Sequence, residues 1–410
     1  MGLGRLDNSK VVMVDHVLPG ELVLAEETRR HRGYVEARAV DIIRASADRC
    51  PPACPLSGQC GGCHLQHAVY SAQLAIKEGI VLEMAQRAGL VPDQGISPIA
   101  VSPQTLHYRY KLRLHVARDG RIGFHRAKSN TVVPLTSCLL ASRPINEVIA
   151  RCAAMRLEGA VSDIELFCSP ADQGVSAVLG LRNRHDHPAP VLLDQIMDQT
   201  VLAGLALRRG RNIEPVGDWF PLRQAFFSGT RKYTLSWDCR SFFQVNPSQN
   251  ERLVQLVLEL AGEVSGRRIL DLYCGMGNFA IPVALAGAEV HGVEVNPHAI
   301  RAAEANARQV GLADRVRFST RSVQQYLHAA GKARPDLVLI DPPRQGLARL
   351  ANAVACLGAE RIIYISCDPA TLFRDLRTMT GQGYTLASLQ PVDMFPQTSH
   401  IETVALLEKN

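Results

Sequence analysis

The sequence lacks an apolar run approaching the roughly 20 residues that span a bilayer, so no membrane-spanning helix is expected. Its first residues also lack the basic and then apolar pattern of a secretory signal, so we expect a cytoplasmic protein. Neither sign of charge dominates, because 45 Lys and Arg stand against 39 Asp and Glu, a formal net charge of +6. This mildly basic balance permits a nucleic-acid partner without requiring one. Internal repeats and low-complexity segments are also absent.

The composition is that of a folded chain, since 47% of the residues are hydrophobic and 20% are charged. These fractions exclude the disordered and collagen-like classes. At about 150 residues per domain, the 410 residues predict two or three domains, each large enough to bury its own core.

Cysteine is the residue type whose placement is most informative. The chain has 11 cysteines, an odd number, and an intracellular chain of this length needs no disulfide framework. Four of them fall within 14 residues, and these are Cys50, Cys54, Cys60 and Cys63. The other seven are scattered along the chain, and these are Cys138, Cys152, Cys168, Cys239, Cys274, Cys356 and Cys367. Clustered thiols in a reducing compartment usually hold a metal, so we expect a metal site near the first four.

The N-terminal quarter of the sequence divides into three parts. Residues 1–47 contain alternating runs separated by turn residues, which predict a small β-module that is short by about one strand. Residues 48–65 form a loop rich in Pro, Cys and Gly. Residues 66–99 carry a helical pattern that ends at Gly89, and we expect this helix to pack on the C-terminal domain.

In the remainder of the sequence, the pattern of predicted strands and helices changes near residue 240. Residues 100–240 are rich in strand patterns, including a hairpin over 111–126 with an Asp-Gly turn at its centre. Residues 241–410 alternate strand and helix patterns, which predicts a doubly wound parallel sheet and an α/β fold class.

A glycine-rich turn near residue 275 has the features of a cofactor loop. A buried strand pattern ends at Tyr273, the turn Cys274–Asn278 follows, and a helix opens after it. Glycines let a backbone approach a ligand, and a helix N-terminus offers free N–H groups. The next strand ends at Glu294, which suits a ribose diol. Ala280 stands where a dinucleotide-binding motif would place its third glycine, and the turn instead resembles the S-adenosylmethionine loop of class I methyltransferases.

Two further strand patterns end in residues that can do chemistry. Asp341 follows one hydrophobic strand, at the edge where open α/β sheets place their sites. Cys367 follows the next strand, and we expect a helix to begin near Thr371. Helix N-termini and nearby cations lower a thiol pKa, so we expect Cys367 to be a reactive thiolate and not an inert buried thiol.

Taken together, these motifs resemble the RNA 5-methyluridine methyltransferases. The matching segments are S-C-D-P-A-T-L-F-R-D, D-P-P-R-Q-G, D-L-Y-C-G-M-G-N, F-F-Q-V-N and H-I-E-T-V. Upstream, the spacing Cys54-x5-Cys60-x2-Cys63 is similar to the branch that carries a [4Fe-4S] cluster, which acts on 23S ribosomal RNA. The resemblance implies a class I, Rossmann-like catalytic domain over 241–410 and a central iron–sulfur and RNA-binding domain over 48–65 and 100–240. It also implies an N-terminal OB-like barrel of the TRAM type over 1–47, which is shortened here.

The resemblance implies a covalent mechanism at a uracil ring. Cys367 would add to C6 and make C5 nucleophilic, Glu402 would remove the C5 proton, and Asp341 would hold the target base or the cofactor amine. The positions that match the family's S-adenosylmethionine contacts are Gln244, Tyr273, Gly275, Gly277, Asn278, Glu294 and Asp341. Tyr273 is a mild departure, because many relatives have Phe there.

For the cluster, the resemblance implies Cys54, Cys60 and Cys63 with Cys138 as the distant fourth ligand. Cys50 is the competing ligand, but only Cys54 keeps the five-residue spacing to Cys60. Zinc is an alternative occupant, although these spacings are not those of a zinc ribbon. A radical S-adenosylmethionine enzyme would need a C-x3-C-x2-C triad, which this sequence lacks.

A segment of alternating basic and aromatic residues predicts contact with RNA. Its members are His107, Tyr108, Arg109, Tyr110, Lys111, Arg113, Arg121, Phe124, His125, Arg126 and Lys128. Such residues can hold phosphates and stack unpaired bases, although a solvated strand face would look similar. We expect a monomer that methylates a flipped loop uridine of 23S rRNA. The alternatives are the same chemistry on tRNA, a noncatalytic RNA-binding or assembly factor, and methylation of cytosine.

Overall fold

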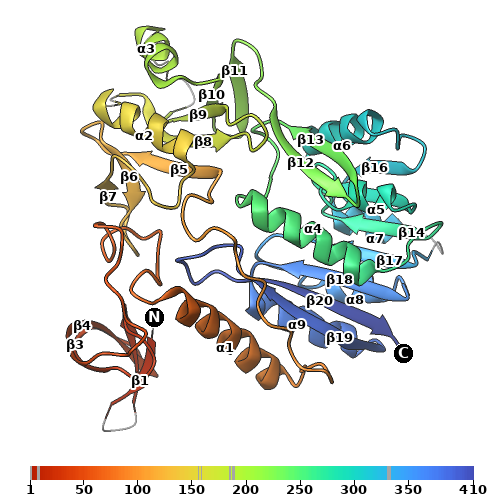
Figure 1. Cartoon of the computed structure of the whole chain (residues 1–410), viewed down its shortest axis with the longest axis horizontal. Coiled ribbons are helices and arrows are strands. Elements are labelled where there is room, and N and C mark those ends of the chain that lie inside the picture. The colour runs from red at the N-terminus through yellow and green to blue at the C-terminus, as the bar shows by residue number, and fades with distance from the viewer. Residues whose placement is uncertain are drawn as a thin grey trace.

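The structure is a computed structural model that describes residues 2–6, 10–155, 157, 159–183, 186, 190–329 and 334–410. The predicted domain ranges also include residues 1, 7–9, 156, 158, 184, 185, 187–189 and 330–333, which lie outside the described residues. Four sheets follow one another along the described chain, and Figure 1 shows the first and third quarters of the chain on opposite sides of the molecule. No helix in these ranges is both long and apolar enough to cross a membrane.

The N-terminal sheet has four strands in the order β1-β2-β4-β3. They are β1 (Gly2–Arg5), β2 (Val11–Asp15), β3 (Leu22–Arg30) and β4 (Tyr34–Arg44). The sequence patterns predicted the last three, and the structure adds β1, which pairs antiparallel with β2. The core of this sheet is small, because Val12, Val14, Val35 and Ala37 are its only fully buried apolar cluster among the described residues.

The central sheet has seven strands in the order β11-β10-β9-β8-β5-β6-β7. They are β5 (Lys111–Val116), β6 (Ile122–His125), β7 (Val132–Pro134), β8 (Val161–Cys168), β9 (Val175–Leu181), β10 (Gly204–Arg209) and β11 (Asn212–Val216). The predicted Asp-Gly hairpin is confirmed, since β5 and β6 pair antiparallel. Two helices accompany the sheet, α2 (Arg143–Met155) and α3 (Pro190–Thr200), and the sequence patterns missed α2.

A two-stranded ribbon joins the central sheet to the C-terminal domain. It consists of β12 (Leu222–Ser228) and β13 (Arg231–Trp237), which pair antiparallel. Its buried side chains, which include Phe226 and Trp237, share one apolar cluster with the helix and sheet residues of the C-terminal domain. The ribbon therefore packs on that domain, although it precedes residue 241 in the chain.

The C-terminal sheet has seven strands in the order β16-β15-β14-β17-β18-β20-β19. They are β14 (Arg268–Leu272), β15 (Glu289–Glu294), β16 (Val316–Thr320), β17 (Leu337–Ile340), β18 (Arg361–Ser366), β19 (Tyr384–Val392) and β20 (Glu402–Lys409). Its helices are α4 (Pro247–Ala261), α5 (Ala280–Leu285), α6 (Pro297–Gln309), α7 (Val323–Ala329), α8 (Leu350–Ala355) and α9 (Pro369–Thr380). The predicted α/β fold is confirmed. The predicted parallel pairing holds for β14 to β18, and the structure adds β20, which runs antiparallel between β18 and β19.

Helix α1 (Tyr70–Ala88) lies against α9, as Figure 1 shows at the lower edge of the C-terminal sheet. Its predicted end at Gly89 is confirmed, since that residue has a φ of 67°, the left-handed conformation that glycine adopts at low cost. Val81 and Ala85 of α1 are fully buried in the same apolar cluster as Phe373 of α9. Apolar contact therefore joins a helix from the N-terminal quarter to the C-terminal domain.

A buried ion pair adds to this contact. The Nζ atom of Lys77, on α1, lies 2.5 Å from Oδ1 of Asp393, and both side chains are completely buried. The Tyr70 hydroxyl donates to Oδ2 of the same carboxylate at 2.7 Å, and Lys77 also donates to the Phe395 carbonyl at 3.0 Å. Every polar atom of this group has a partner, which burial of charge requires.

Breaking the Lys77–Asp393 pair on one side should cost about 3–5 kcal/mol of folding free energy, because a buried carboxylate would lose its counter-charge. Urea unfolding of Lys77→Met measures this loss. Arg87→Met is the matched control on the same helix, since Arg87 pairs with Glu83 in an exposed contact worth about 0.5 kcal/mol. Equal stabilities of the two variants would contradict this account.

Candidate active site

The carboxyl ends of the parallel strands bring three of the predicted site residues to one edge of the sheet. Leu272 of β14 pairs with Ile340 of β17 and with Val293 of β15. The residues that follow these partners are Tyr273, Asp341 and Glu294, so they leave the sheet at the same level. This is the edge at which open α/β sheets bind ligands.

Three residues of the turn after β14 adopt the left-handed backbone conformation. Tyr273, Gly275 and Gly277 have φ values of 66°, 54° and 91°. A Cβ on Gly277 would lie only 2.9 Å from Cγ1 of Ile281, so the turn has no room for a side chain there. Tyr273 is held in this costly conformation by its backbone N–H, which donates to the Val293 carbonyl at 2.9 Å.

Three carboxylates lie close enough at this edge to influence one another. Asp271, on β14, is completely buried, and its carboxylate oxygens find no hydrogen-bonding partner among the described residues. Burial raises its pKa well above the usual range, and the charges of Asp341 and Glu294 raise it further. Sequence reasoning did not select Asp271, although the residue begins the D-L-Y-C-G-M-G-N motif.

Asp341 has one clear partner, which comes from the predicted F-F-Q-V-N segment. Burial raises the pKa of Asp341 above its usual value, and a hydrogen bond to the Gln244 side chain opposes that rise. Gln244 is 7% exposed. Two residues later, Asn246 caps α4 through its side chain and also donates to the Met394 carbonyl at 3.1 Å. Gln244 is therefore held on a segment that is fixed at its far end.

Asn278 lies in the loop, but its side chain turns toward α4. Its amide exchanges two hydrogen bonds with the amide of Asn250, at 3.0 Å and 2.9 Å. Glu294 accepts the backbone N–H of Asn296 at 2.8 Å through one carboxylate oxygen. The Asn278 side chain thus fastens the loop to α4, whereas its backbone and the two glycines form the turn.

These features fit a cofactor that carries positive charge. An unpartnered buried carboxylate beside two others is electrostatically costly, and a sulfonium or ammonium group nearby would offset the repulsion. The turn leads into α5, and its glycines let the backbone come close to a ligand. The residues at this edge therefore complement the positive charge of S-adenosylmethionine.

Cys367 and Glu402 lie next to each other on neighbouring strands. Strands β18 and β20 pair antiparallel, and Ser366 is opposite Thr403 at the end of the ladder. The next opposed positions are Cys367 and Glu402, so residues 35 positions apart in the sequence meet across one strand spacing. Glu402 is 2% exposed, and Cys367 is partly buried.

The expectation that Cys367 has a lowered pKa is wrong for the protein without ligands. Burial raises the pKa of this thiol to about 11, and the charges of Glu402 and Asp341 raise it while Arg344 lowers it. Helix α9 begins at Pro369, two residues before the predicted start, and the Asp368 carboxylate caps it by accepting the Thr371 N–H at 3.1 Å. The cap places a negative charge at the helix N-terminus, which offsets the dipole that was expected to stabilise a thiolate.

Glu402 is held in a similar environment. Burial raises its pKa well above the usual range, and the charge of Asp341 adds to this effect while Arg344 opposes it. A carboxyl group with a raised pKa can act as a proton acceptor or donor near neutral pH. Asp341, Cys367 and Glu402 therefore form one electrostatically coupled group, with Arg344 as the nearby cation.

The four cysteines predicted as ligands line one cavity of about 300 Å³, although they come from separate parts of the chain. Cys54, Cys60 and Cys63 lie on the loop before α1, and Cys138 lies between β7 and α2. Cys50 is not among the lining residues, and its thiol instead donates to the Gln66 carbonyl at 3.6 Å.

Gln66 organises this cavity, and the sequence patterns gave it no role. Its side-chain Oε1 accepts the Cys54 N–H at 3.1 Å, and its Nε2 donates to the Cys63 sulfur at 3.3 Å. Cys138 is fixed from the other side, since its N–H donates to the Asn146 side chain at 2.7 Å. Burial raises the pKa of Cys63 to about 12, and the charges of Cys138 and the other two cluster cysteines contribute to that rise.

Within the described ranges, no group of three or more His, Cys, Asp or Glu side chains is arranged to hold a single metal ion. A cluster of several iron atoms holds its thiolates farther apart than one ion does, and it accepts four Cys ligands. The donor set around the cavity consists of sulfur atoms, which suit iron–sulfur clusters and zinc and not magnesium or calcium. The donor chemistry of the four thiols therefore suits an iron–sulfur cluster or zinc.

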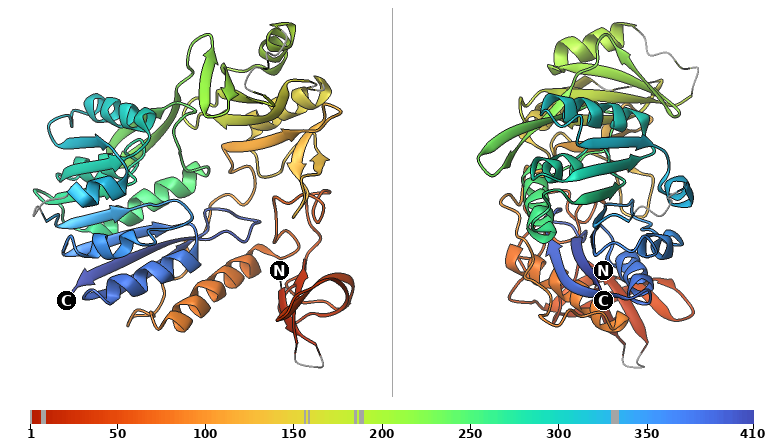
Figure 2. Two further views of the ribbon diagram at one scale, coloured as in Figure 1. Left: turned by 180° about the vertical axis from the view of Figure 1, so that it is seen from behind. Right: turned by 90° about the vertical axis from the view of Figure 1, so that its right-hand side faces the viewer.

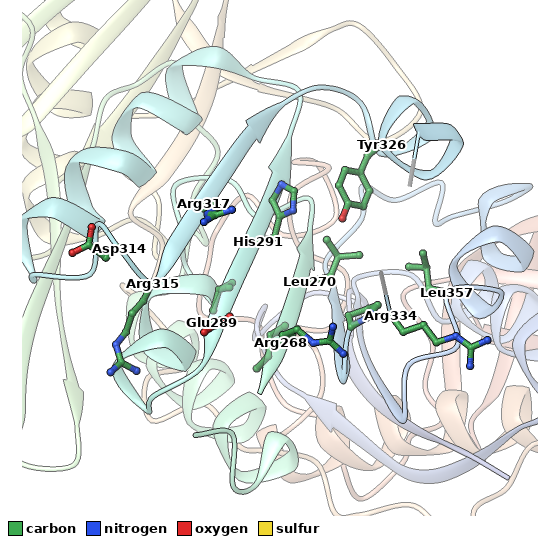
Figure 3. Close-up of a pocket in the computed structure, with 13 residues that line it drawn as sticks. Arg268, Leu270, Glu289, His291, Asp314, Arg315, Arg317, Tyr326, Arg334 and Leu357 are labelled. Carbon is green, nitrogen blue, oxygen red and sulfur yellow. The ribbon is translucent and has the colours of Figure 1, made fainter. Parts of the chain in front are cut away.

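A second cavity, of about 420 Å³, lies at the opposite edge of the C-terminal sheet. Figure 3 shows Arg268 and Leu270 on β14, Glu289 and His291 on β15, and Tyr326 on α7 around it. The strands begin there, whereas Asp341 and Cys367 follow strand ends. This cavity is therefore separate from the edge that carries the predicted chemistry.

The basic and aromatic segment predicted to contact RNA is partly structural. Tyr108 is completely buried, and its hydroxyl donates to the Pro396 carbonyl at 2.9 Å. Arg113 forms two hydrogen bonds of 3.0 Å with the Asp163 carboxylate. The expectation that Tyr108 stacks on a base is therefore wrong, because no face of its ring is accessible.

Comparison with known proteins covers the whole chain. Residues 92–410 match the family model described as tRNA (Uracil-5-)-methyltransferase. The 23S rRNA (uracil(1939)-C(5))-methyltransferase RlmD of Ralstonia nicotianae is 35% identical, with 100% of this chain and 96% of the relative covered. The protein of the same name from Acidithiobacillus ferrooxidans is 32% identical, with 100% and 94% covered. The crystal structure of Pyrococcus abyssi tRNA (uracil-54, C5)-methyltransferase in complex with S-adenosyl-L-homocysteine has a TM-score of 0.76 and 25% identity, with 99% of this chain and 96% of that chain covered.

The environment of Cys367 leads to a prediction about thiol reactivity. Because the pKa of Cys367 is about 11, its alkylation rate should rise steadily between about pH 7 and pH 10. Glu402→Gln removes a negative charge, so it should lower the thiol pKa and shift this profile to lower pH. Arg344→Gln removes the cation and should shift the profile to higher pH.

Mass spectrometry of iodoacetamide-treated protein measures these rates, with the exposed thiol of Cys356 as an internal reference in each digest. Identical profiles for the wild type and the Glu402→Gln variant would mean that the two side chains are not electrostatically coupled.

Proposed function

Because this chain belongs to the tRNA (Uracil-5-)-methyltransferase family, we propose that it transfers a methyl group from S-adenosylmethionine to C5 of a uridine in 23S ribosomal RNA. The chain is an RNA uracil-C5 methyltransferase, and what we propose beyond this is that its substrate is ribosomal RNA. The observation that carries the chemistry is the position of Cys367 opposite Glu402, beside Asp341, at the carboxyl edge of the sheet.

Two comparisons favour different RNA substrates. The relatives that match at 32% and 35% identity are named for 23S rRNA, whereas the matching crystal structure, at 25% identity, is of a tRNA enzyme. We give the nearer sequences more weight, so a loop uridine of 23S rRNA is the proposed target and tRNA is the alternative. A purely RNA-binding role would leave the group formed by Cys367, Glu402 and Asp341 without a purpose.

We propose that Cys367 begins the reaction. The thiol first loses its proton to solvent, and the thiolate then adds to C6 of the uracil ring, which forms an S–C6 bond and moves the electron pair of the C5=C6 bond toward O4 as an enolate. The enolate makes C5 nucleophilic. S-adenosylmethionine would supply an activated methyl group there, and C5 would form the new carbon–carbon bond as the sulfur–methyl bond breaks and its electron pair remains on the sulfur.

Glu402 completes the reaction in this proposal. It removes the proton from C5, the electron pair of the C5–H bond restores the C5=C6 double bond, and the S–C6 bond breaks to release the Cys367 thiolate. The raised pKa of Glu402 makes it a stronger base once ionised. Because only the ionised form can accept the proton, this step should slow as the pH falls through that raised pKa.

The cofactor contacts in this proposal come from the edge residues. Glu294 would bind the ribose diol, the backbone of Gly275 and Gly277 would approach the cofactor, and the Gln244–Asp341 pair would lie near its amino acid part or the target base. Tyr273 and Asn278 shape the turn. Asp271 is a further candidate, because no side chain of the described residues forms a hydrogen bond with its completely buried carboxyl group.

We also propose that Cys54, Cys60, Cys63 and Cys138 hold a [4Fe-4S] cluster. Four thiols around one cavity, with Cys50 excluded from it, support this ligand set. Such a cluster would tie the loop before α1 to the central sheet. Zinc is the alternative occupant that a metal analysis would distinguish.

The substrate is tested by tritium release from [5-³H]uridine in unmodified 23S rRNA and, separately, in bulk tRNA. Release from rRNA alone is the expected result. Release from tRNA alone would keep the chemistry and overturn the substrate, and release from neither would overturn the proposed activity.

Two variants should separate the roles of the nucleophile and the base. Cys367→Ala should abolish turnover and retain cofactor binding, because the S–C6 bond cannot form. Glu402→Gln should slow turnover by about 10²–10⁴-fold and accumulate a covalent protein–RNA adduct. Denaturing gel electrophoresis with labelled RNA detects that adduct. A Glu402→Gln variant with full activity and no adduct would assign the proton transfer to another group.

The ligand set of the cluster predicts different outcomes for two neighbouring thiols. Cys60→Ser should lose iron, inorganic sulfide and the brown absorbance of anaerobically purified protein. Cys50→Ser is the matched control and should retain all three, because Cys50 does not line the cavity. A colourless wild-type protein that contains zinc would replace the iron–sulfur assignment.

A further inference from the structure

The segment from Asp393 to Ile401 joins β19 to β20 and leads directly to Glu402. Figure 2 shows this blue connection leave the C-terminal sheet and extend toward the chain that precedes α1. Although it is a loop, most of its residues are buried, including Asp393, Met394 and Thr398 at 2% exposure or less. It has the burial of a core element.

Three consecutive carbonyl groups of this segment are bound by other parts of the chain. The Phe395 carbonyl accepts from Nζ of Lys77 at 3.0 Å, and the Pro396 carbonyl accepts from the Tyr108 hydroxyl at 2.9 Å. The Gln397 carbonyl accepts two backbone N–H groups, those of His64 and Leu65, at 3.0 Å and 3.1 Å. His64 directly follows Cys63, so the last of these contacts joins the segment to the cysteine-rich loop.

Gln397 also uses its remaining polar groups. Its backbone N–H donates to Oε1 of Gln73 at 2.9 Å, and its side-chain Oε1 accepts from Nε2 of Gln73 at the same distance. Its Nε2 lies 3.5 Å from the Thr105 carbonyl. Gln397 adopts a φ of 67°, which a residue with a side chain adopts only where its surroundings hold it.

We propose that Gln397 is a positioning residue for Glu402. Through Gln397, the position of the cysteine-rich loop determines where Glu402 lies and therefore how fast Glu402 removes the C5 proton. The inference rests on the proposed role of Glu402 as the base. Cys63, His64, the Gln397 carbonyl and the chain to Glu402 form one short connection. A shift of the loop therefore moves the backbone that leads to the base, whereas in the described part of the chain no hydrogen bond joins β18, the strand that Cys367 follows, to the cysteine-rich loop.

This placement predicts which step fails. When Gln397 is changed, Cys367 still forms the S–C6 bond, because Cys367 follows β18, whose ladders with β17 and β20 do not include the segment 393–401, whereas Glu402 directly follows that segment. Removal of the C5 proton by Glu402 is slowed, so the covalent adduct accumulates. A residue that only stabilised the fold would instead lower adduct formation and adduct breakdown together.

Three substitutions separate the contribution of the Gln397 side-chain hydrogen bonds from that of its backbone conformation. Gln397→Gly keeps the positive φ at no cost and loses the side-chain bonds, whereas Gln397→Ala loses both the bonds and the conformational freedom. Gln73→Ala removes the partner from α1 and leaves Gln397 itself unchanged. Gln86→Ala is the control, since Gln86 is an exposed residue of the same helix with no side-chain contact to the segment.

The experiment measures adduct formation, adduct breakdown and cofactor binding for each variant, with Glu402→Gln run in parallel. We expect Gln397→Ala to slow breakdown at least about tenfold, with formation and cofactor binding near wild-type values. Gln397→Gly and Gln73→Ala should show the same pattern to a smaller extent, and Gln86→Ala should show none. Equal slowing of formation and breakdown in all three would overturn the positioning role.

A second measurement tests the connection without activity. In Cys60→Ser, amide hydrogen exchange of peptides within 393–401 should increase, whereas exchange in the strand β16 should not change. Unchanged exchange in 393–401 would overturn the connection to the cysteine-rich loop. If Glu402→Gln forms no adduct, the proposed function fails; if it forms one and Gln397→Ala does not accumulate it, this inference alone fails.

Discussion

The burial of Glu402 opposite Cys367 is the constraint on which the rest of the site depends. A carboxyl group at 2% exposure cannot be stabilised by water, so its charge and that of the thiol depend on neighbouring side chains. Asp341 raises the pKa values of both groups and Arg344 lowers them. The antiparallel insertion of β20 produces this pair, because a wholly parallel sheet would place the start of β20, and with it Glu402, at the opposite edge.

The sequence identified residues at the ends of strands well, because strand, turn and helix patterns are local. Asp341, Cys367 and Glu294 could each be located from a hydrophobic run and the residue that follows it. Their electrostatics could not be predicted in this way. The pKa of Cys367 depends on its burial and on the charges of Glu402, which comes from another strand, and of Arg344, which follows a different one. Both effects depend on distances that only the folded chain defines.

The residues whose roles sequence reasoning missed act through the positions that their side chains take in the folded chain. Gln66 bonds to both Cys54 and Cys63, and Asp271 lacks any partner in the described chain. A glutamine after a cysteine motif and an acid inside a strand have no distinctive spacing. The sequence patterns also missed helix α2. The helix is short and amphipathic, and its apolar residues, such as Ile145 and Val148, are stabilised by burial in the tertiary fold.

The loop before α1, together with α1 itself, lies more than 300 residues from the loop before β20 in sequence, yet hydrogen bonds from the first loop and a buried ion pair from α1 hold these parts together. Apolar contacts alone would tolerate small sliding movements between them, because the hydrophobic effect has no directional preference. Hydrogen bonds to three successive carbonyls do not tolerate such sliding, since each loses its geometry within a fraction of an ångström. The directional bonds of Lys77, Tyr108 and the His64 N–H therefore fix the position of this segment, and the apolar core supplies most of the free energy that keeps these elements together.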